Sequence, residues 1–329
     1  MSSFVISADE LKKKTNPMYS EMNDVTAANI YAIADPSIKE LIPPPLKLAN
    51  PALLIIYVSN IKEPTFAEPY MEGGIGVLTT LQDGSGKIHT GVYYFSLQLC
   101  GTGAQNAIFL GREDAGLPKK LACLIYLKRS CDNVCFHIER KGVRLLDAEI
   151  NIGEYNDPTF SNDGLENLNT KKGMLVDGAV LTHRYSTDFA NGFSNMRIYN
   201  YNSPNFYCQY EPAYAKVKLQ SSKYDPWGEI KIAKVLGGAW ARNNNFVIDV
   251  TPIYSCSDSE AFNAMRYLYT GRFDPLVGRR TDRTPFDCLN KSSPFPFNVF
   301  TPPQKPEFIA MGLDKLPAID LKTNKWWWQ

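Results

Sequence analysis

The feature that most constrains the fold is a series of short segments rich in Val, Ile, Thr, Tyr and Phe that starts at residue 51. LLIIYVSNI, GIGVLTTL and TGVYYFSLQL come first, and a turn of Gly, Asp and Ser at 82–86 joins the last two. β-Branched and aromatic residues between turn residues are typical of strands, and short turns indicate antiparallel hairpins. We therefore predict a sheet whose strands follow one another along the chain.

Further segments of this kind continue the series to residue 255. We predict strands in NAIFLGRE, LACLIYLKR, NVCFHIERKGVRLLDAEINI, MLVDGAVLTHRY, MRIYNYN, AYAKVKLQS, GEIKIAKVLGGAWA and NFVIDVTPIYS. Residues 153–172 are polar and rich in Asn, so we expect a loop there.

Helices are expected around this sheet. Residues 1–34 are predicted to be a helical segment that starts with a capping box at Ser7 and is stopped by Pro17. A second helix is predicted over 257–271 because its apolar residues recur at helical spacing and a Gly ends it. Residues 272–329 carry many Pro, Arg and Phe without periodicity. We thus divide the chain into the N-terminal segment 1–34, a domain at 35–271, and a C-terminal extension, 272–329, that packs on the core or on a partner subunit.

Charge and hydropathy narrow the class of protein. The chain has 35 Lys and Arg against 34 Asp and Glu, a net charge of +1, whereas nucleic-acid binders carry a basic excess. No stretch approaches the roughly 20 apolar residues of a membrane span, and the N-terminus has no apolar leader. We expect a cytoplasmic homo-oligomer with reduced cysteines that binds neither nucleic acid nor membrane.

The segment that points to chemistry is GREDAGLPKKLA, residues 111–122. It places Lys119 and Lys120 at the start of an apolar strand, where neighbouring side chains face opposite sides. Apolar surroundings disfavour the charged ammonium, and a neutral amine can attack a carbonyl carbon. Taken alone, the pair could also be an ordinary basic pair at an exposed strand end.

This segment resembles the signature of the acetoacetate decarboxylase superfamily, because its Gly, Arg, Glu, Pro and both lysines agree in identity and spacing. The resemblance implies that Lys119 forms a Schiff base with a ketone. PYMEGG at 69–74 resembles the family's Tyr-x-Glu-x-Gly segment, which implies that Glu72 lies beside Lys119 as general acid/base. IKIAKVLGGAW is similar to a late family strand that ends in a pocket tryptophan, here Trp240. The resemblance spans residues 30–258.

The resemblance also implies a fold and a mechanism. The fold is α+β, with mostly antiparallel strands curled into a cone- or barrel-like sheet around one enclosed pocket and with peripheral helices. The iminium formed by an activated lysine, for which acetoacetate decarboxylase itself is the standard example, stabilises a carbanion at the neighbouring carbon. No cofactor is needed. We expect no metal, because Cys131, Cys135 and His137 lack the spacing of a zinc site.

Two positions depart from the family pattern. Tyr57 stands where the family has a second glutamate, and the family's N-terminal arginine falls near Asp24, with no arginine before Arg112. Those groups engage the substrate carboxylate in the family; here Arg184 or Arg242 could replace them. We predict a Schiff-base lyase acting on a β-keto acid or polyketide-like carbonyl compound in small-molecule biosynthesis. The alternatives are an aldolase, dehydratase or cyclase using the same lysine, and a non-catalytic ligand-binding protein.

Six further residues are candidates for contact with a small carbonyl substrate. An apolar wall for a substrate larger than acetoacetate would be formed by Tyr57, Tyr93, Tyr94 and Trp240. His183 precedes a polar loop and would line the pocket mouth. Arg112 would either contact substrate or form a buried ion pair that braces the lysine loop.

Overall fold

A computed structural model of the chain describes residues 5, 7–14, 20–162, 164–170, 173–188 and 192–274. The chain divides into two compact units, Met1–Pro275 and Leu276–Gln329, and the sheet and helices belong to the first. The predicted C-terminal extension lies outside the described residues except for its first three, 272–274. Within the described part of the chain, no helix has the length and apolar character needed to cross a membrane.

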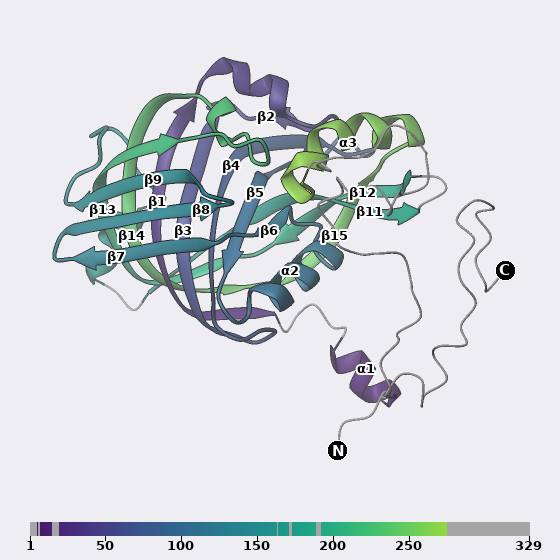
Figure 1. Ribbon diagram of the computed structural model, residues 1–329, viewed down its shortest axis with the longest axis horizontal. Helices are drawn as coiled ribbons and strands as arrows, with labels where there is room; N and C mark the ends of the chain where they lie inside the picture. The colour runs from purple at the N-terminus through teal and green to yellow at the C-terminus, as the bar shows by residue number, and fades with distance from the viewer. Residues whose placement is uncertain are drawn as a thin grey trace, which may run out of the picture. The chain divides into compact units, whose positions relative to one another are not determined.

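One large sheet dominates the first unit (Figure 1). Its strands are β1 (Glu21–Ala34), β2 (Lys47–Leu48), β3 (Leu53–Pro64), β4 (Tyr70–Gln82), β5 (Ile88–Cys100), β6 (Lys119–Leu121), β7 (Leu124–Ser130), β8 (Asn133–Arg140), β9 (Val143–Ile152), β10 (Met174–Val176), β11 (Ala179–Asp188), β12 (Gly192–Asn202), β13 (Asn205–Leu219), β14 (Ile232–Phe246) and β15 (Asp249–Ser255). Hydrogen bonding follows the order β15-β12-β11-β5-β4-β3-β1-β14-β13-β9-β8-β7, with β10, β2 and β6 attached to β13, β4 and β5.

Neighbouring strands run antiparallel except at two places, β11 with β5 and β5 with β6. The mostly antiparallel α+β fold with few helices is therefore as predicted. The path ends at β15 on one side and at β7 on the other, so the sheet is open and does not close into a barrel.

Short helices accompany the sheet. They are α1 (Ala8–Lys14), α2 (Ala104–Glu113), α3 (Asp258–Arg272) and the 3-10 helices η2 (Pro36–Leu41), η3 (Leu165–Thr170) and η4 (Trp227–Glu229). The predicted C-terminal helix is confirmed as α3. Ser257 caps it, and Glu260 completes a capping box by accepting from the backbone of Ser257.

Two predicted elements are wrong. Residues 21–34, predicted as helix, form β1, which pairs with β3 and β14 and lies inside the sheet. Pairing on both sides overrides the helix propensity of its alanines, of which Ala28 and Ala32 are fully buried. NAIFLGRE, predicted as a strand, belongs to helix α2. Ala104, Ala107 and Ile108 bury one face of this helix at a spacing of three and four.

The far end of the sheet folds back over its middle, because β7 contacts β3, β4 and β5 (Figure 1). The face enclosed in this way holds the main core, which includes Ile56, Val58 and Phe136. The opposite face of β4 and β5 carries a second core in which Leu97 and Leu99 pack with residues of α2. Each strand serves both cores because its side chains alternate in direction.

Candidate active site

Strand register places Lys119 beside Glu72. β6 runs parallel to β5 with Lys119 paired to Leu97, and Glu72 on β4 is paired to Leu99. Both side chains therefore point to the face that α2 covers. The Lys119 Nζ lies 2.8 Å from Glu72 Oε2, and the two residues are 5% and 8% exposed. The structure brings together the two residues for which the resemblance implied a shared site.

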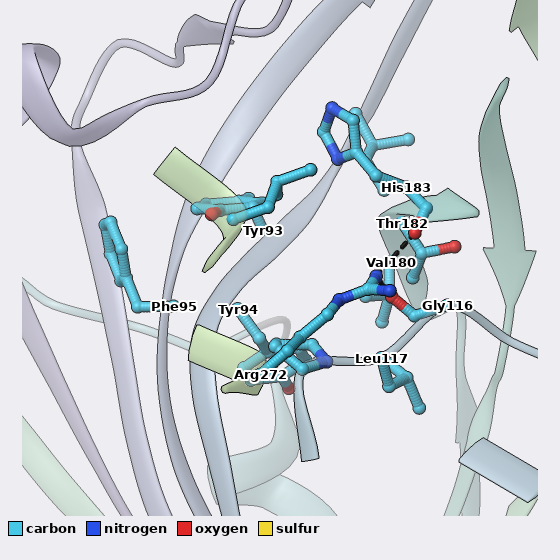
Figure 2. A pocket seen from close by; sticks show the side chains of 12 residues that line it. Tyr93, Tyr94, Phe95, Gly116, Leu117, Val180, Thr182, His183 and Arg272 are labelled. Carbon is cyan, nitrogen blue, oxygen red and sulfur yellow. Dashed lines mark hydrogen bonds between the residues drawn. The ribbon is translucent and has the colours of Figure 1, made fainter. Parts of the chain in front are cut away.

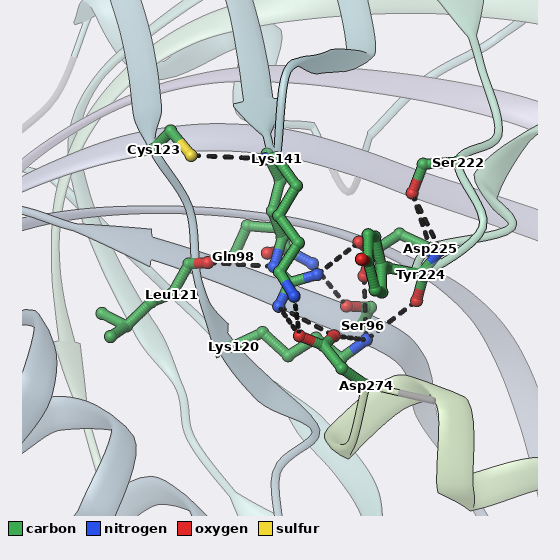
Figure 3. Close-up of polar contacts among 11 residues, drawn as sticks. Ser96, Gln98, Lys120, Leu121, Cys123, Lys141, Ser222, Tyr224, Asp225 and Asp274 are labelled. Atoms are coloured by element: carbon green, nitrogen blue, oxygen red, sulfur yellow. Dashed lines mark hydrogen bonds and ion pairs between the residues drawn. The ribbon is translucent and has the colours of Figure 1, made fainter. Parts of the chain in front are cut away.

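Lys120 points to the opposite face, as the strand geometry predicted. Its Nζ donates to Asp225 Oδ1 at 2.9 Å and to the carbonyl oxygen of Tyr224 at 3.1 Å (Figure 3). Arg140 donates to the other oxygen of Asp225 at 2.6 Å, and Asp225 is 2% exposed. Lys120 is thus held in a buried ion cluster, on the face of the sheet opposite to Lys119 and Glu72.

The same ion cluster reaches the end of α3. Arg140 donates to Leu121 O at 2.9 Å and pairs with Asp274 at 2.9 Å. Burial alone would raise the pKa of Asp274, but hydrogen bonds from Arg140 and Lys141 hold that pKa below its usual value. The cluster therefore ties β6 and β8 to the residues that follow α3.

Four tyrosines surround the lysine–glutamate pair, and we call them the tyrosine cage: Tyr57, Tyr70, Tyr94 and Tyr201. Tyr57 donates its hydroxyl to Glu72 Oε1 at 2.7 Å and packs edge-on against Tyr94, with ring centres 6.0 Å apart. The Tyr70 ring centre lies 5.9 Å from Lys119 Nζ. Burial, followed by the negative charge of Glu72, raises the pKa of all four phenols. The cage is neutral and mostly apolar, with hydroxyl groups as its polar atoms.

The structure explains why the lysine motif, residues 111–122, begins with a glycine. The Lys119 side chain crosses this glycine of α2 so closely that an added Cβ would lie 2.7 Å from Lys119 Cδ and Cε and 3.1 Å from Nζ. A larger residue here would displace the amine. Sequence reasoning missed this role, and it missed Tyr70 and Tyr201 as cage residues, although Tyr70 lies inside the second motif.

Trp240 does not belong to the site. Ala28 is paired with both Trp240 and Val58, so Trp240 shares the face of Val58, opposite to that of Tyr57. There the Arg129 guanidinium lies 5.4 Å from the tryptophan ring centre. The prediction was wrong because it identified the strand correctly but not the face.

His183 was predicted at a pocket mouth, but it is buried. It is 1% exposed and packs edge-on against Tyr93, with ring centres 6.2 Å apart (Figure 2). Burial, assisted by the charge of Arg272, lowers the pKa of His183 to about 3. These three residues line a cavity of about 10 Å³, which is room for one water molecule at most.

Arg112 stacks on an aromatic ring instead of bracing the loop as an ion pair. Its guanidinium lies 5.1 Å from the ring centre of Phe273, and Glu113 is exposed. Among the residues that the structure describes, Arg112 makes no ion pair, so the predicted buried pair is wrong. The helical turn directs Arg112 toward the end of α3.

The arginines considered as carboxylate binders are engaged elsewhere. Arg242 pairs with Asp24 at 3.1 Å, and Arg184 lies over the ring of Tyr199. Arg242 and Asp24 border a polar cavity of about 360 Å³ whose other lining residues are Asn23, Val25, Glu63, Cys208, Asn243 and Asn244. Lys119 and Glu72 line neither this cavity nor the small one.

A mostly antiparallel open sheet that buries a lysine–glutamate pair under a short helix places the chain among acetoacetate decarboxylase-like proteins. The chain belongs to the acetoacetate decarboxylase family, whose model matches residues 8–254.

The chain is similar in sequence to a curated protein, a "CLA biosynthesis isomerase" of Lactiplantibacillus plantarum. The two are 33% identical over 277 residues, which cover 83% of this chain and 95% of that protein. The fold is similar to that of acetoacetate decarboxylase from Legionella pneumophila, with a TM-score of 0.60, 15% identity, and coverage of 78% and 99% of the two chains. It is also similar to the enduracididine biosynthesis enzyme MppR, with a TM-score of 0.55, 10% identity, and coverage of 77% and 95%.

Proposed function

We propose that this chain is an enzyme that forms an imine between Lys119 and a ketone and moves a proton at the neighbouring carbon with Glu72. The observation that carries the proposal is the 2.8 Å contact between Lys119 Nζ and Glu72 Oε2 inside a buried cage. Across this contact Glu72 accepts the ammonium proton, which leaves a neutral amine and a neutral carboxylic acid. The amine then attacks the carbonyl carbon, and Glu72 gives its proton to the carbinolamine hydroxyl, which leaves as water and yields the iminium.

The proton-transfer step follows from the same pair. Glu72, returned to its carboxylate form, removes a proton from the carbon next to the iminium and gives an enamine. If a double bond lies one carbon further along, Glu72 can return the proton at the far end of that double bond. The carbon–carbon double bond then shifts into conjugation, and hydrolysis releases the ketone and frees Lys119. The water lost on imine formation is replaced at hydrolysis, so the product is an isomer of the substrate.

We therefore favour isomerisation of a β,γ-unsaturated ketone as the net reaction. The "CLA biosynthesis isomerase" relative supports a reaction whose product is an isomer of the substrate. The cage supports it too, because a phenol at Tyr57 stands where the family pattern has a carboxylate, and both candidate arginines are engaged elsewhere. An apolar cage with few polar atoms suits a carbonyl flanked by carbon chain rather than a small β-keto acid.

The second candidate is the Schiff-base lyase that releases carbon dioxide. The family model and the solved acetoacetate decarboxylases favour it, and the same iminium would accept the electron pair left by decarboxylation. Incubation with a β,γ-unsaturated ketone and with acetoacetate separates the two candidates. A rise in ultraviolet absorbance of the conjugated ketone supports isomerisation, and carbon dioxide release from acetoacetate at a comparable rate supports the lyase.

The covalent step is tested by borohydride reduction in the presence of the ketone. We expect a stable mass increase on the peptide that contains Lys119 and none in Lys119→Ala. Lys47→Ala, which removes an exposed lysine of β2, is the matched control and should be labelled like the wild type. Full activity of Lys119→Ala would exclude the imine mechanism.

The proton step is tested by Glu72→Gln, which keeps the side-chain shape. We expect turnover to fall about 10²-fold or more, as is typical of a lost general acid or base, and exchange of the substrate's α-hydrogens with deuterium to fall with it. Glu40→Gln removes an exposed carboxylate of η2 and should change neither rate. Imine trapping without any turnover in the wild type would instead favour a ligand-binding protein.

A further inference from the structure

The end of α3 fills a gap between two strands next to the lysine loop, which we define as residues 114–118. β5 and β11 pair at a single position, Val92 with Val180. The Arg272 side chain occupies the space beside this pair, and its Nη2 donates to the carbonyl oxygens of Gly116 and His183 (Figure 2). One guanidinium thus joins the lysine loop to β11 where the ladder of strand hydrogen bonds is missing.

The contact with Gly116 is a short distance along the chain from Lys119. Gly116 has a φ of +71°, and an added Cβ would lie 2.7 Å from His183 O, so this position of the loop requires glycine to approach β11 so closely. The amide of Leu117 donates to Gly111 O, and that of Lys119 donates to Leu117 O, both at 2.9 Å. Since Gly111 is also the residue that Lys119 crosses, this chain of contacts connects Arg272 to the amine.

Arg272 is expensive to bury, which argues against an incidental placement. It is 7% exposed, and burial lowers its pKa. Its guanidinium lies 4.6 Å from the ring centre of Tyr185, and no carboxylate among the described residues forms an ion pair with it. A buried cation without a counter-charge costs stability, whereas an apolar side chain of similar size would not.

We propose that Arg272 is a positioning residue that holds the lysine loop so that the Lys119 amine stays beside Glu72. The expected loss of turnover rests on the proposed function of Lys119, whereas the expected loosening of the lysine loop does not. Asp274, two residues on, pairs with Lys120 at 3.5 Å, so the chain at the end of α3 binds both the lysine loop and β6. α3 begins after residue 254, where the match to the family model ends, so this support lies outside the matched segment.

The test is Arg272→Met, with Arg266→Met as matched control. Arg266 is exposed on the same helix, so the control removes the same charge without the two carbonyl contacts. Hydrogen exchange of peptides covering 114–121, the unfolding midpoint, and kcat and KM are measured for both variants. In Arg272→Met we expect faster exchange over 114–121 and a kcat lower by about 10²-fold with KM nearly unchanged, as for a displaced reacting group. Arg266→Met should match the wild type in all four.

Two further variants keep the proposal testable if Arg272→Met does not fold. Arg272→Lys keeps the charge but lacks the planar fork that reaches two carbonyls, so we expect an intermediate kcat. Arg272→Ala should regain kcat when propylguanidinium is added. Wild-type exchange over 114–121 in a folded Arg272 variant overturns the proposal, and this readout needs no substrate. Faster exchange together with an unchanged kcat would leave the loop contact standing and count against the use of Lys119 in catalysis.

Discussion

Replacing Gly111 with Ala separates stability from activity, because the added methyl group meets only the far end of a flexible side chain. Its Cβ would lie 2.7 Å from Lys119 Cδ and Cε, whereas ordinary contact begins near 3.4 Å. The lysine must therefore move by about 0.7 Å, the difference between these distances. Replacing glycine by alanine inside a helix stabilises the fold by about 0.5–1 kcal/mol. This stabilisation offsets the lower end of the cost of overpacking, which is roughly 1–3 kcal/mol.

We therefore expect the free energy of unfolding of Gly111→Ala to stay within about 1 kcal/mol of the wild type. Turnover should fall by up to about 10²-fold, because a displacement approaching 1 Å of a reacting group costs about that much. Urea unfolding gives the first quantity, and steady-state kinetics with borohydride trapping gives the second.

Gly84→Ala is the control, since an added Cβ at Gly84 meets nothing within 4 Å. It should leave turnover unchanged. Wild-type turnover and trapping in Gly111→Ala would contradict this role of Gly111, because the amine would then not depend on the contact. A large loss of stability would refute it as well, because the clash would then reach more than the lysine tip.

Three further predictions concern the surrounding residues. The pKa of His183 is about 3 in the folded protein against 6.5 when unfolded, so only the unfolded state takes up a proton as the pH falls from about 6.5 to 3. The free energy of unfolding should decrease over that range by about 1.4 kcal/mol per pH unit, and the decrease should be shallower in His183→Phe. Urea unfolding at several pH values measures both, and an equal pH dependence in the two proteins would contradict this prediction. Asp225→Asn removes the buried carboxylate that Lys120 and Arg140 share and leaves Asp274 as their remaining anion, so it should destabilise by about 3 kcal/mol, the lower end for breaking a buried ion pair. Glu149→Gln, which breaks an exposed pair with Lys216, should leave the unfolding midpoint unchanged. Tyr57→Phe removes the 2.7 Å hydrogen bond to Glu72 and should lower turnover about tenfold at unchanged fold, and an unaffected rate would show that Tyr57 serves only packing.

The sequence predicted those parts of the fold in which local pattern and tertiary pairing agree. The hairpin strands from residue 53 onward have strong strand composition, and α3 has its own cap and stop. β1 escaped prediction because EMNDVTAANIYAIA is rich in alanine, and only its two neighbouring strands make it extended. Conversely, the Ile and Phe of α2 suggested a strand, but the alanines at helical spacing decide which face is buried.

The candidate site divides in the same way. Lys119 and Glu72 were found because each lies in a contiguous motif. Tyr201 could not be found, because it joins the cage from β12, more than eighty residues beyond Lys119, and no local pattern shows where β12 packs. Trp240 was placed wrongly because a motif identifies a strand, whereas the direction of its side chains depends on the register with neighbouring strands.

The opposite directions of Lys119 and Lys120 mean that the identity of the reactive lysine is a matter of alignment and not of residue type. β6 has only three residues, and a slip of one position against β5 would turn Lys120 toward Glu72 and Lys119 toward Asp225. The swapped arrangement would carry the same two ammonium groups on the same two faces. What distinguishes the two alignments is the length of the lysine loop, residues 114–118, between α2 and β6. Deletion or insertion of a single residue in that loop would therefore turn Lys120 instead of Lys119 toward Glu72, and the position proposed to react would move along the sequence without any lysine being gained or lost.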